Sequence, residues 1–188
     1  MLLLMACSDD SSSVSVDSVP ESSGSLSSSS LATVSDLAEL ESKPFYDEGW
    51  REKCLGIIND YRATEGLDAL TLAPEEKQVC TYSQAADDLA ENAPHGHFHA
   101  CGEWAQNSGP NGSVNANTKA SDLVNMYLKM MWEDEKALVT SGQKDPSKKE
   151  DYPAIGHYLN MKGDYKSVAC GIALSADGQK SWLNVNFF

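Results

Sequence analysis

Basic side chains are scarce in this sequence: 14 lysines and arginines stand against 28 aspartates and glutamates, which gives a formal net charge of −14. A surface of this sign repels phosphate backbones and anionic lipid headgroups, so we do not expect nucleic acid as a partner. The sequence also lacks any apolar run of about 18 residues, and we therefore expect no membrane-spanning helix. Any membrane attachment would have to be covalent.

The local motifs of several enzyme classes are missing as well. There is no Gly-x-Ser-x-Gly elbow, no P-loop, no dinucleotide-binding fingerprint and no His-Glu-x-x-His pair. The five cysteines include no Cys-x-x-Cys spacing, which argues against a structural zinc finger. These absences leave the common hydrolase, nucleotidase and dehydrogenase classes without support.

The first 48 residues differ in composition from the rest. They contain nine acidic residues and one lysine, a net charge of −8, which leaves 13 basic and 19 acidic residues, a net charge of −6, for residues 49–188. Serine runs, acidic residues and the lack of aromatics over residues 8–42 predict a flexible linker. The recurrence of Leu31, Val34, Leu37 and Leu40 is compatible with a short helical turn there.

The chain opens with Leu4-Met5-Ala6-Cys7, which resembles a bacterial lipobox. A secretory signal needs a basic segment and a longer apolar stretch than this, so the alternative is a chance apolar start. We expect residues 1–7 to be the remnant of a lipoprotein signal peptide, with lipidation at Cys7, and residues 8–47 to be a Ser-rich, acidic, disordered linker. This predicts an extracytoplasmic location, secreted or lipid-anchored at the cell surface, and Ser8 after the cysteine would suit a bacterial outer membrane.

Residues 48–188 have the periodicity of one globular domain. Apolar spacings of three and four predict a helix over 48–65, and Pro74 followed by two glutamates predicts another with Val79, Tyr82, Ala86 and Leu89 buried. The Gly-, Asn- and Ser-rich residues 107–117 are predicted to form a loop, and residues 121–139 a third helix.

Short strand-like runs dominate the C-terminal part. We predict strands over 155–161, 167–174 and 182–188, and a further strand around 101–106. Because no helical crossovers separate the last strands, the sequence favours an α/β (α+β) fold, a three-layer α-β-α sandwich with a small antiparallel sheet.

All four histidines lie in two places, His95-Gly96-His97-Phe98-His99 and Gly156-His157-Tyr158. Alternating residues of an extended chain project to one side, so the first three could approach one Zn²⁺ as neutral imidazoles. The alternative is a polar loop with three exposed histidines.

Five segments together resemble the CAP family, the fold of cysteine-rich secretory, venom-allergen and plant pathogenesis-related proteins. They occur in family order over most of residues 50–188: Ile57-Ile58-Asn59-Asp60-Tyr61-Arg62 with Gly66-Leu67, His95 to Phe98 with Gly102-Glu103, Trp132 to Lys136, Gly156-His157-Tyr158, and Val168-Ala169-Cys170-Gly171. In this family two histidines and two glutamates line one cavity.

The resemblance assigns that cavity to His95, Glu103, Glu135 and His157. The histidines would bind a divalent cation, Zn²⁺ or else Mg²⁺ or Ca²⁺, and the glutamates would orient the rings or act as bases. His97 or His99 could replace His95, and Glu133 competes with Glu135. Trp104 stands where the family has an asparagine, which removes one orienting amide.

Two functions follow from this resemblance. The first is an extracellular binding or interaction module for a small molecule, lipid, sterol, glycan or surface protein. The second is a metal-dependent hydrolase, a peptidase or esterase, in which Glu103 or Glu135 is the catalytic base for a metal-bound water. A surface protein with a vestigial cavity is a third possibility.

Four cysteines remain if Cys7 is acylated, an even number that suits two disulfide bonds in an exported domain. We expect Cys54 to pair with Cys80 and Cys101 with Cys170, although four reduced, buried cysteines are the alternative.

Overall fold

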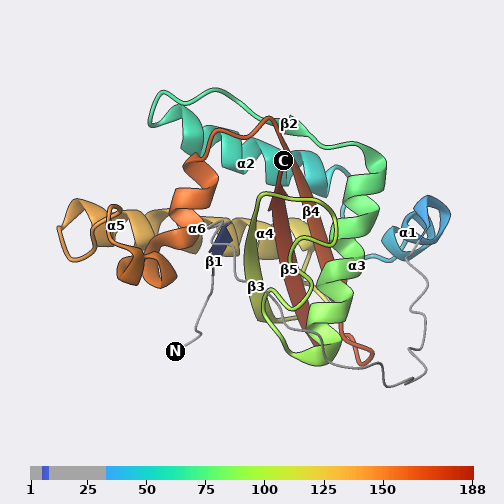
Figure 1. The fold of residues 1–188 in the computed structure, drawn as a ribbon. Helices are drawn as coiled ribbons and strands as arrows, with labels where there is room; N and C mark the ends of the chain where they lie inside the picture. The colour runs from blue at the N-terminus through green and yellow to red at the C-terminus, as the bar shows by residue number, and fades with distance from the viewer. Residues whose placement is uncertain (1–5, 9–32) are drawn as a thin grey trace, which may run out of the picture.

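The computed structural model describes residues 6–8 and 33–188 (Figure 1). The helices are α1 (Val34–Glu41), α2 (Trp50–Ala63), α3 (Glu75–Glu91), α4 (Ala120–Lys129), α5 (Glu135–Thr140) and α6 (Tyr152–Lys162). The strands are β1 (Ala6–Ser8), β2 (Thr71–Leu72), β3 (Ala105–Ser113), β4 (Ser167–Leu174) and β5 (Lys180–Phe187). None of the helices in this part of the chain is long and apolar enough to span a membrane.

The strands form one sheet in the order β1-β3-β5-β4-β2. All pairings are antiparallel except that of β2 with β4. Helix α3 packs on β4 and β5, whereas α2 packs on β4 and α6 on β3 from the other face, where α4 contacts α2 and places Tyr127 against β3 (Figure 1). The predicted three-layer α-β-α sandwich with a small, mainly antiparallel sheet is therefore confirmed.

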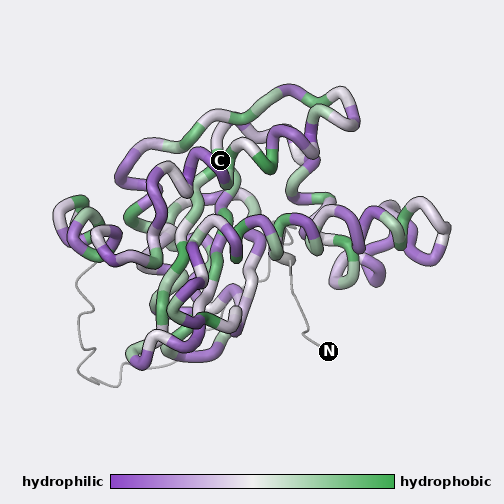
Figure 2. Tube along the Cα trace, turned by 180° about the vertical axis from the view of Figure 1, so that it is seen from behind, coloured by the Kyte–Doolittle hydropathy of each residue, from purple (hydrophilic) through white to green (hydrophobic). Residues whose placement is uncertain are grey.

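The two faces of the sheet differ in chemistry. The face towards α2 and α4 is apolar and includes Val168, Cys170, Leu183, Val185 and Phe187, all buried in the main core. The face towards α3 carries buried polar residues, and hydrophobic (green) and hydrophilic (purple) positions accordingly interchange along the strands and helices (Figure 2). A polar layer of this kind needs every group hydrogen-bonded, which fixes the position of α3.

Helix α2 confirms the helix predicted over 48–65. Helix α3 confirms the helix predicted to begin at Pro74, which is its N-cap. The predicted buried stripe of α3 is confirmed only at Val79, because the helix turns Gln78, Thr81, Gln84 and Asp88 towards the sheet. Tyr82, Ala86 and Leu89 are only partly buried, beside Trp182. Hydrophobic periodicity selected the wrong face because hydrogen bonds, rather than apolar contacts, dominate this interface.

Gly171 allows α3 to approach β4 closely. A Cβ atom at this position would lie 2.5 Å from the backbone carbonyl carbon of Thr81 in α3. Contacts this short do not occur in folded proteins, so the side chain has to be absent here.

The predicted helix over 121–139 is present as one continuous rod. It consists of α4, a π-helical turn over Met130–Asp134 and α5. The π turn buries Met131 and Trp132 and changes the helix phase just before Glu135.

The strand predicted over 155–161 is wrong, because these residues form α6. Pro153 lies in its first turn, and Ile155, Tyr158 and Met161 recur every three residues on a buried face. The neighbouring residues Gly156, His157 and Asn160 are also buried, so the segment is apolar or enclosed nearly all round. A short run of that kind does not distinguish a helix from a strand by periodicity.

The predicted loop over 107–117 is also wrong for most of its length, since β3 extends to Ser113. The strand predicted around 101–106 therefore overlaps only the first two residues of β3. Gln106, Asn107 and Ser108 are buried, and their side chains bond to neighbouring elements, so tertiary contacts override a composition typical of loops.

Residues 33–47 belong to the folded part, in contrast to the linker predicted over 8–47. Thr33 caps α1, Leu37 is buried, and Phe45 and Tyr46 enter the main core. The possible helical turn over residues 31–40 corresponds to α1. Residues 9–32 of the predicted linker lie outside the described residues.

The two disulfide bonds join Cys54 to Cys170 and Cys80 to Cys101. The predicted pairing of Cys54 with Cys80 and of Cys101 with Cys170 is wrong. Helices α2 and α3 lie on opposite faces of the sheet. Cys54 on α2 therefore meets Cys170 of β4 on the α2 face, whereas Cys80 on α3 meets Cys101 in the loop on the α3 face. The prediction that all four cysteines form disulfides is confirmed.

Candidate functional site

Glu135 and His157 form a buried pair. His157 Nδ1 lies 2.5 Å from Glu135 Oε1, and the backbone N–H of Tyr158 donates to Oε2 at 2.9 Å. The two residues are 8% and 1% exposed. A carboxylate that accepts from Nδ1 fixes the tautomer in which Nε2 carries the ring's lone pair, the arrangement seen behind metal-binding or proton-accepting histidines.

Glu133, the competing candidate, occupies a different environment. Its side chain is half exposed, and it accepts a hydrogen bond from Tyr61 Oη at 3.0 Å. The π turn directs Glu135, rather than Glu133, towards α6.

Glu103 is 1% exposed, but its partners differ from those of Glu135. Oε1 accepts from Gln84 Nε2 at 2.6 Å and from the backbone N–H of His99 at 2.9 Å, and Oε2 accepts from the backbone N–H of Cys101 at 3.0 Å. Three donors thus surround this carboxylate, and two of them belong to the preceding loop. Glu103 therefore holds the loop against α3.

The three clustered histidines do not project to one side, contrary to the prediction. His95 and His99 have positive φ angles of 61° and 74°, so the segment is a series of turns rather than a strand. His95 Nδ1 bonds to Gln106 Oε1 at 2.8 Å, His97 Nδ1 to Asp88 Oδ1 at 2.9 Å, and His99 Nδ1 to the backbone oxygen of Glu103 at 3.1 Å. Each ring has its own partner.

His97 is bound to a fully buried carboxylate. Asp88 Oδ2 also accepts from Asn184 Nδ2 at 2.8 Å. The hydrogen bond to Asp88 raises the pKa of His97 above its ordinary value, against the opposing effect of burial, and the charges of Asp88, Asp87 and Glu91 add to the rise. His97 therefore connects the loop to α3 through Asp88.

The two predicted halves of the site meet at β3. We call residues 93–104, with His95 and Glu103, the loop half, and α5 with α6, carrying Glu135 and His157, the helix half. Gln106 bonds to His95, and the next residue, Asn107, donates from Nδ2 to the backbone oxygen of His157 at 3.1 Å. Asn160 of the helix half also donates to the backbone oxygen of Gln106, so both halves contact the same two neighbouring residues of β3.

Several polar residues of the site have no signal in the sequence. Gln84 and Gln106 connect Glu103, His95 and Asn186, while Asn160 Nδ2 donates to Asn107 Oδ1 and to the backbone oxygen of Gln106. Amides are common on surfaces, so only their burial distinguishes them. A pattern search for histidine and carboxylate could not have found them.

Within residues 6–8 and 33–188, no group of three or more His, Cys, Asp or Glu side chains is arranged to hold a metal ion. Glu103 is occupied by N–H donors, and Glu135 by His157 and Tyr158. Cation binding by His95 and His157 stays a prediction, with Glu135 as the group that would orient the ring of His157.

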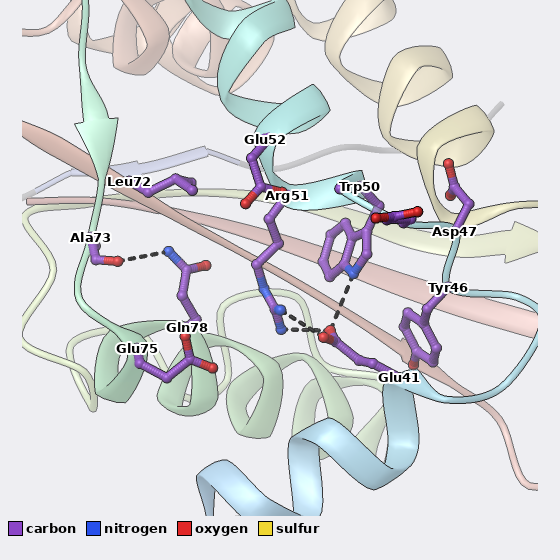
Figure 3. A pocket seen from close by; sticks show the side chains of 12 residues that line it. Glu41, Tyr46, Asp47, Trp50, Arg51, Glu52, Leu72, Ala73, Glu75 and Gln78 are labelled. Carbon is purple, nitrogen blue, oxygen red and sulfur yellow. Dashed lines mark hydrogen bonds and ion pairs between the residues drawn. The ribbon is translucent and has the colours of Figure 1, made fainter.

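A separate pocket of about 250 Å³ lies between α1, the start of α2, β2 and α3 (Figure 3). Arg51 crosses it to Glu41, with Nη2 to Oε1 at 2.6 Å, and Trp50 Nε1 donates to the same carboxylate at 3.2 Å. Four further acidic residues line it, namely Asp47, Glu48, Glu52 and Glu75. None of the predicted cavity residues does, so this pocket is distinct from the candidate site.

Comparison with known proteins identifies the class. Residues 55–188 match the model of the CAP family, described as the cysteine-rich secretory protein family, and the chain belongs to this family. Among solved structures, the chain is similar to Na-ASP-1 at 15% identity and a TM-score of 0.45, over 73% of this chain and 38% of the other. The chain thus spans well under half of that protein. A search of curated proteins found no match.

The family and the two disulfide bonds agree with an extracytoplasmic location, where an oxidising environment preserves such bonds. The lipidation of Cys7 and the roles of the four cavity residues stay predictions.

Proposed function

We propose that this CAP domain is an extracytoplasmic binding module in which the imidazoles of His95 and His157 bind a divalent cation. The observation that supports this most directly is the buried contact between His157 Nδ1 and Glu135 Oε1. A carboxylate behind a histidine raises the basicity of the ring and fixes its orientation, and both effects favour metal binding.

The ligand chemistry favours Zn²⁺ among the predicted cations. Imidazole nitrogen suits Zn²⁺, whereas Mg²⁺ and Ca²⁺ prefer oxygen ligands, and both carboxylates already accept hydrogen bonds from the protein. Water or an external ligand would supply the remaining coordination positions, as in open zinc sites. Such a site would present the cation to a binding partner.

Calorimetric titration of the purified chain with Zn²⁺, Mg²⁺ and Ca²⁺ tests this proposal. We expect Zn²⁺ binding that is lost in His157→Ala and His95→Ala and weakened about tenfold in Glu135→Gln, a typical effect of removing an orienting carboxylate. His97→Ala is the matched control, because His97 bonds to Asp88, and should bind Zn²⁺ as the parent does. Zn²⁺ affinity that is unaffected by His157→Ala would refute the site.

The hydrolase alternative has less support. A catalytic base must accept a proton, but Glu103 already accepts three hydrogen bonds, and Glu135 is engaged with His157 and Tyr158. Peptide and ester hydrolysis should be screened with the same variants. Turnover that disappears in both His95→Ala and His157→Ala would favour the hydrolase over the module.

We also propose that Cys7 is a lipid anchor at the cell surface. The lipobox-like Leu4-Met5-Ala6-Cys7 and the serine-rich acidic segment after it support this. Mass spectrometry of the mature N-terminus from membrane fractions tests it: a diacylated Cys7 is expected, and an unmodified cysteine would refute the anchor.

A further inference from the structure

Strand β3 carries an additional strand along the edge that faces away from β5. Ala6–Ser8 pair antiparallel with it, in the register Ala6 with Asn107, Cys7 with Gln106 and Ser8 with Ala105. β1 also packs against α6, and Figure 1 shows it as a short dark blue arrow beside that helix. The described N-terminal residues Ala6–Ser8 therefore lie between β3 and α6.

The regular part of this edge is short. The pairing of β3 with β5 is interrupted by a bulge between Gly109 and Gly112, and Pro110 within it has no N–H to donate. Before β3, Glu103 is buried against α3. Residues 105–109 thus offer a ladder of only a few residues, which suits a short extended segment rather than a long strand.

The part of β3 that pairs with β1 also contacts both halves of the candidate site. Gln106, opposite Cys7, bonds to His95, and Asn107, opposite Ala6, bonds to the backbone of His157. Asn160 of α6 donates to the backbone oxygen of Gln106 at 3.2 Å. A strand on this edge consequently pairs with residues that contact both the loop half and the helix half.

An exposed tryptophan lies at the beginning of the same edge. Trp104 directly precedes β3 and is 63% exposed, whereas Trp50, Trp132 and Trp182 are buried. Tryptophan is enriched among the residues that contribute most to protein–protein binding.

We propose that the edge of β3 at Ala105–Asn107 binds an extended peptide segment of a partner protein by antiparallel strand addition, and that Ala6–Ser8 occupy this site in cis in the chain before lipoprotein processing. The proposal names the partner class of the binding module proposed above and rests on that function. Main-chain hydrogen bonds supply the affinity in this mode of recognition, and the small residues Ala, Cys and Ser of the cis segment indicate a ligand with small side chains. A lipidated Cys7, held at a membrane, would leave the edge open.

The test uses the full, unlipidated chain and a synthetic peptide of residues 4–10 carrying Cys7→Ser. In the variant chain Cys7→Pro, proline removes an N–H in the centre of β1 and should release the cis segment. We expect this variant to bind the peptide at least about tenfold more tightly than the parent, as a competing intramolecular strand requires. Trp104 fluorescence reports binding, and the amide resonances of Ala105 and Asn107 should shift.

Two methylated peptides provide the matched control. In an antiparallel ladder alternate N–H groups point to the partner strand, so N-methylation at position 7 and N-methylation at positions 6 and 8 should differ at least about tenfold in affinity. Equal affinities, or no gain in affinity from Cys7→Pro, would overturn the proposal. The measurements are made in EDTA, so a failure of cation binding would not affect their outcome.

Discussion

The loop half and the helix half of the candidate site use the same residue types in different ways. In the helix half, Glu135 bonds directly to the ring of His157. In the loop half, Glu103 bonds to two backbone N–H groups and Gln84, while an amide, Gln106, contacts the ring of His95. One glutamate contacts a histidine ring and the other holds a loop, so equivalence in a family motif does not imply equivalent partners.

The two disulfide bonds give the largest expected effects. In the chain-entropy model, replacing both Cys54 and Cys170 with alanine, 116 positions apart, should lower the free energy of unfolding by about 5 kcal/mol, and replacing Cys80 and Cys101, 21 apart, by about 3 kcal/mol. Only the second pair should also increase hydrogen exchange in the loop half at low denaturant. Unchanged exchange at His99 and Cys101 would show that the loop does not depend on its disulfide.

Glu103→Gln should separate the two glutamates. The NH₂ group of the new amide would face the N–H donors that now bond to the carboxylate. We therefore expect the free energy of unfolding, measured in urea, to fall by about 2–3 kcal/mol. Glu133→Gln is the control. Because the Glu133 side chain is half exposed, this substitution should lower the free energy of unfolding by less than about 0.5 kcal/mol. If Glu103→Gln behaved like this control, the loop-holding role would be wrong.

Most of the fold could be predicted where a single physical signal dominates. Amphipathic spacing and Pro74 located α2 and α3, and two short strand-like runs located β4 and β5. The errors occur where polar groups are buried: β3 with Gln106 and Asn107 has the composition of a loop, and α3 buries Thr81, Gln84 and Asp88. Local sequence does not reveal a buried hydrogen-bond network, because its partners are distant in the chain.

One contact of the candidate site agrees with the resemblance, which assigned Glu135 and His157 to one cavity: the two side chains meet across 22 positions, while their roles stay predictions. By contrast, the different partners of His95, His97 and His99 depend on left-handed backbone at two non-glycine residues, for which the sequence carries no clear signal.

The helix half depends on Glu65, which connects α6 and α5 to the end of α2. Its carboxylate binds Lys162 Nζ at 2.5 Å, Tyr158 Oη at 2.6 Å and Lys136 Nζ at 3.0 Å. Burial raises its pKa, but these three partners outweigh burial and lower the pKa from 4.5 to about 2.

Glu65→Gln should therefore lower the free energy of unfolding by about 1–2 kcal/mol at pH 7. A lowered pKa means that the stabilisation is present above pH 4.5 and disappears as the pH falls towards 2. Urea unfolding of parent and variant from pH 7 to pH 2.5 should show the two curves converging. A difference that is independent of pH would exclude the charge of Glu65 as the cause.

The smallest effect is expected for His97 in the loop half, with the opposite dependence on pH. Its pKa is raised by the hydrogen bond to Asp88, so its stabilisation is complete below the ordinary value of 6.5 and is lost as the pH rises through the folded-state pKa. His97→Asn should cost about 0.5–1 kcal/mol at pH 5.5 and less at pH 9, since the ring is partly exposed. NMR titration of the ring should give a pKa above 6.5, and a value below this would mean that the Asp88 contact does not hold the loop half through charge.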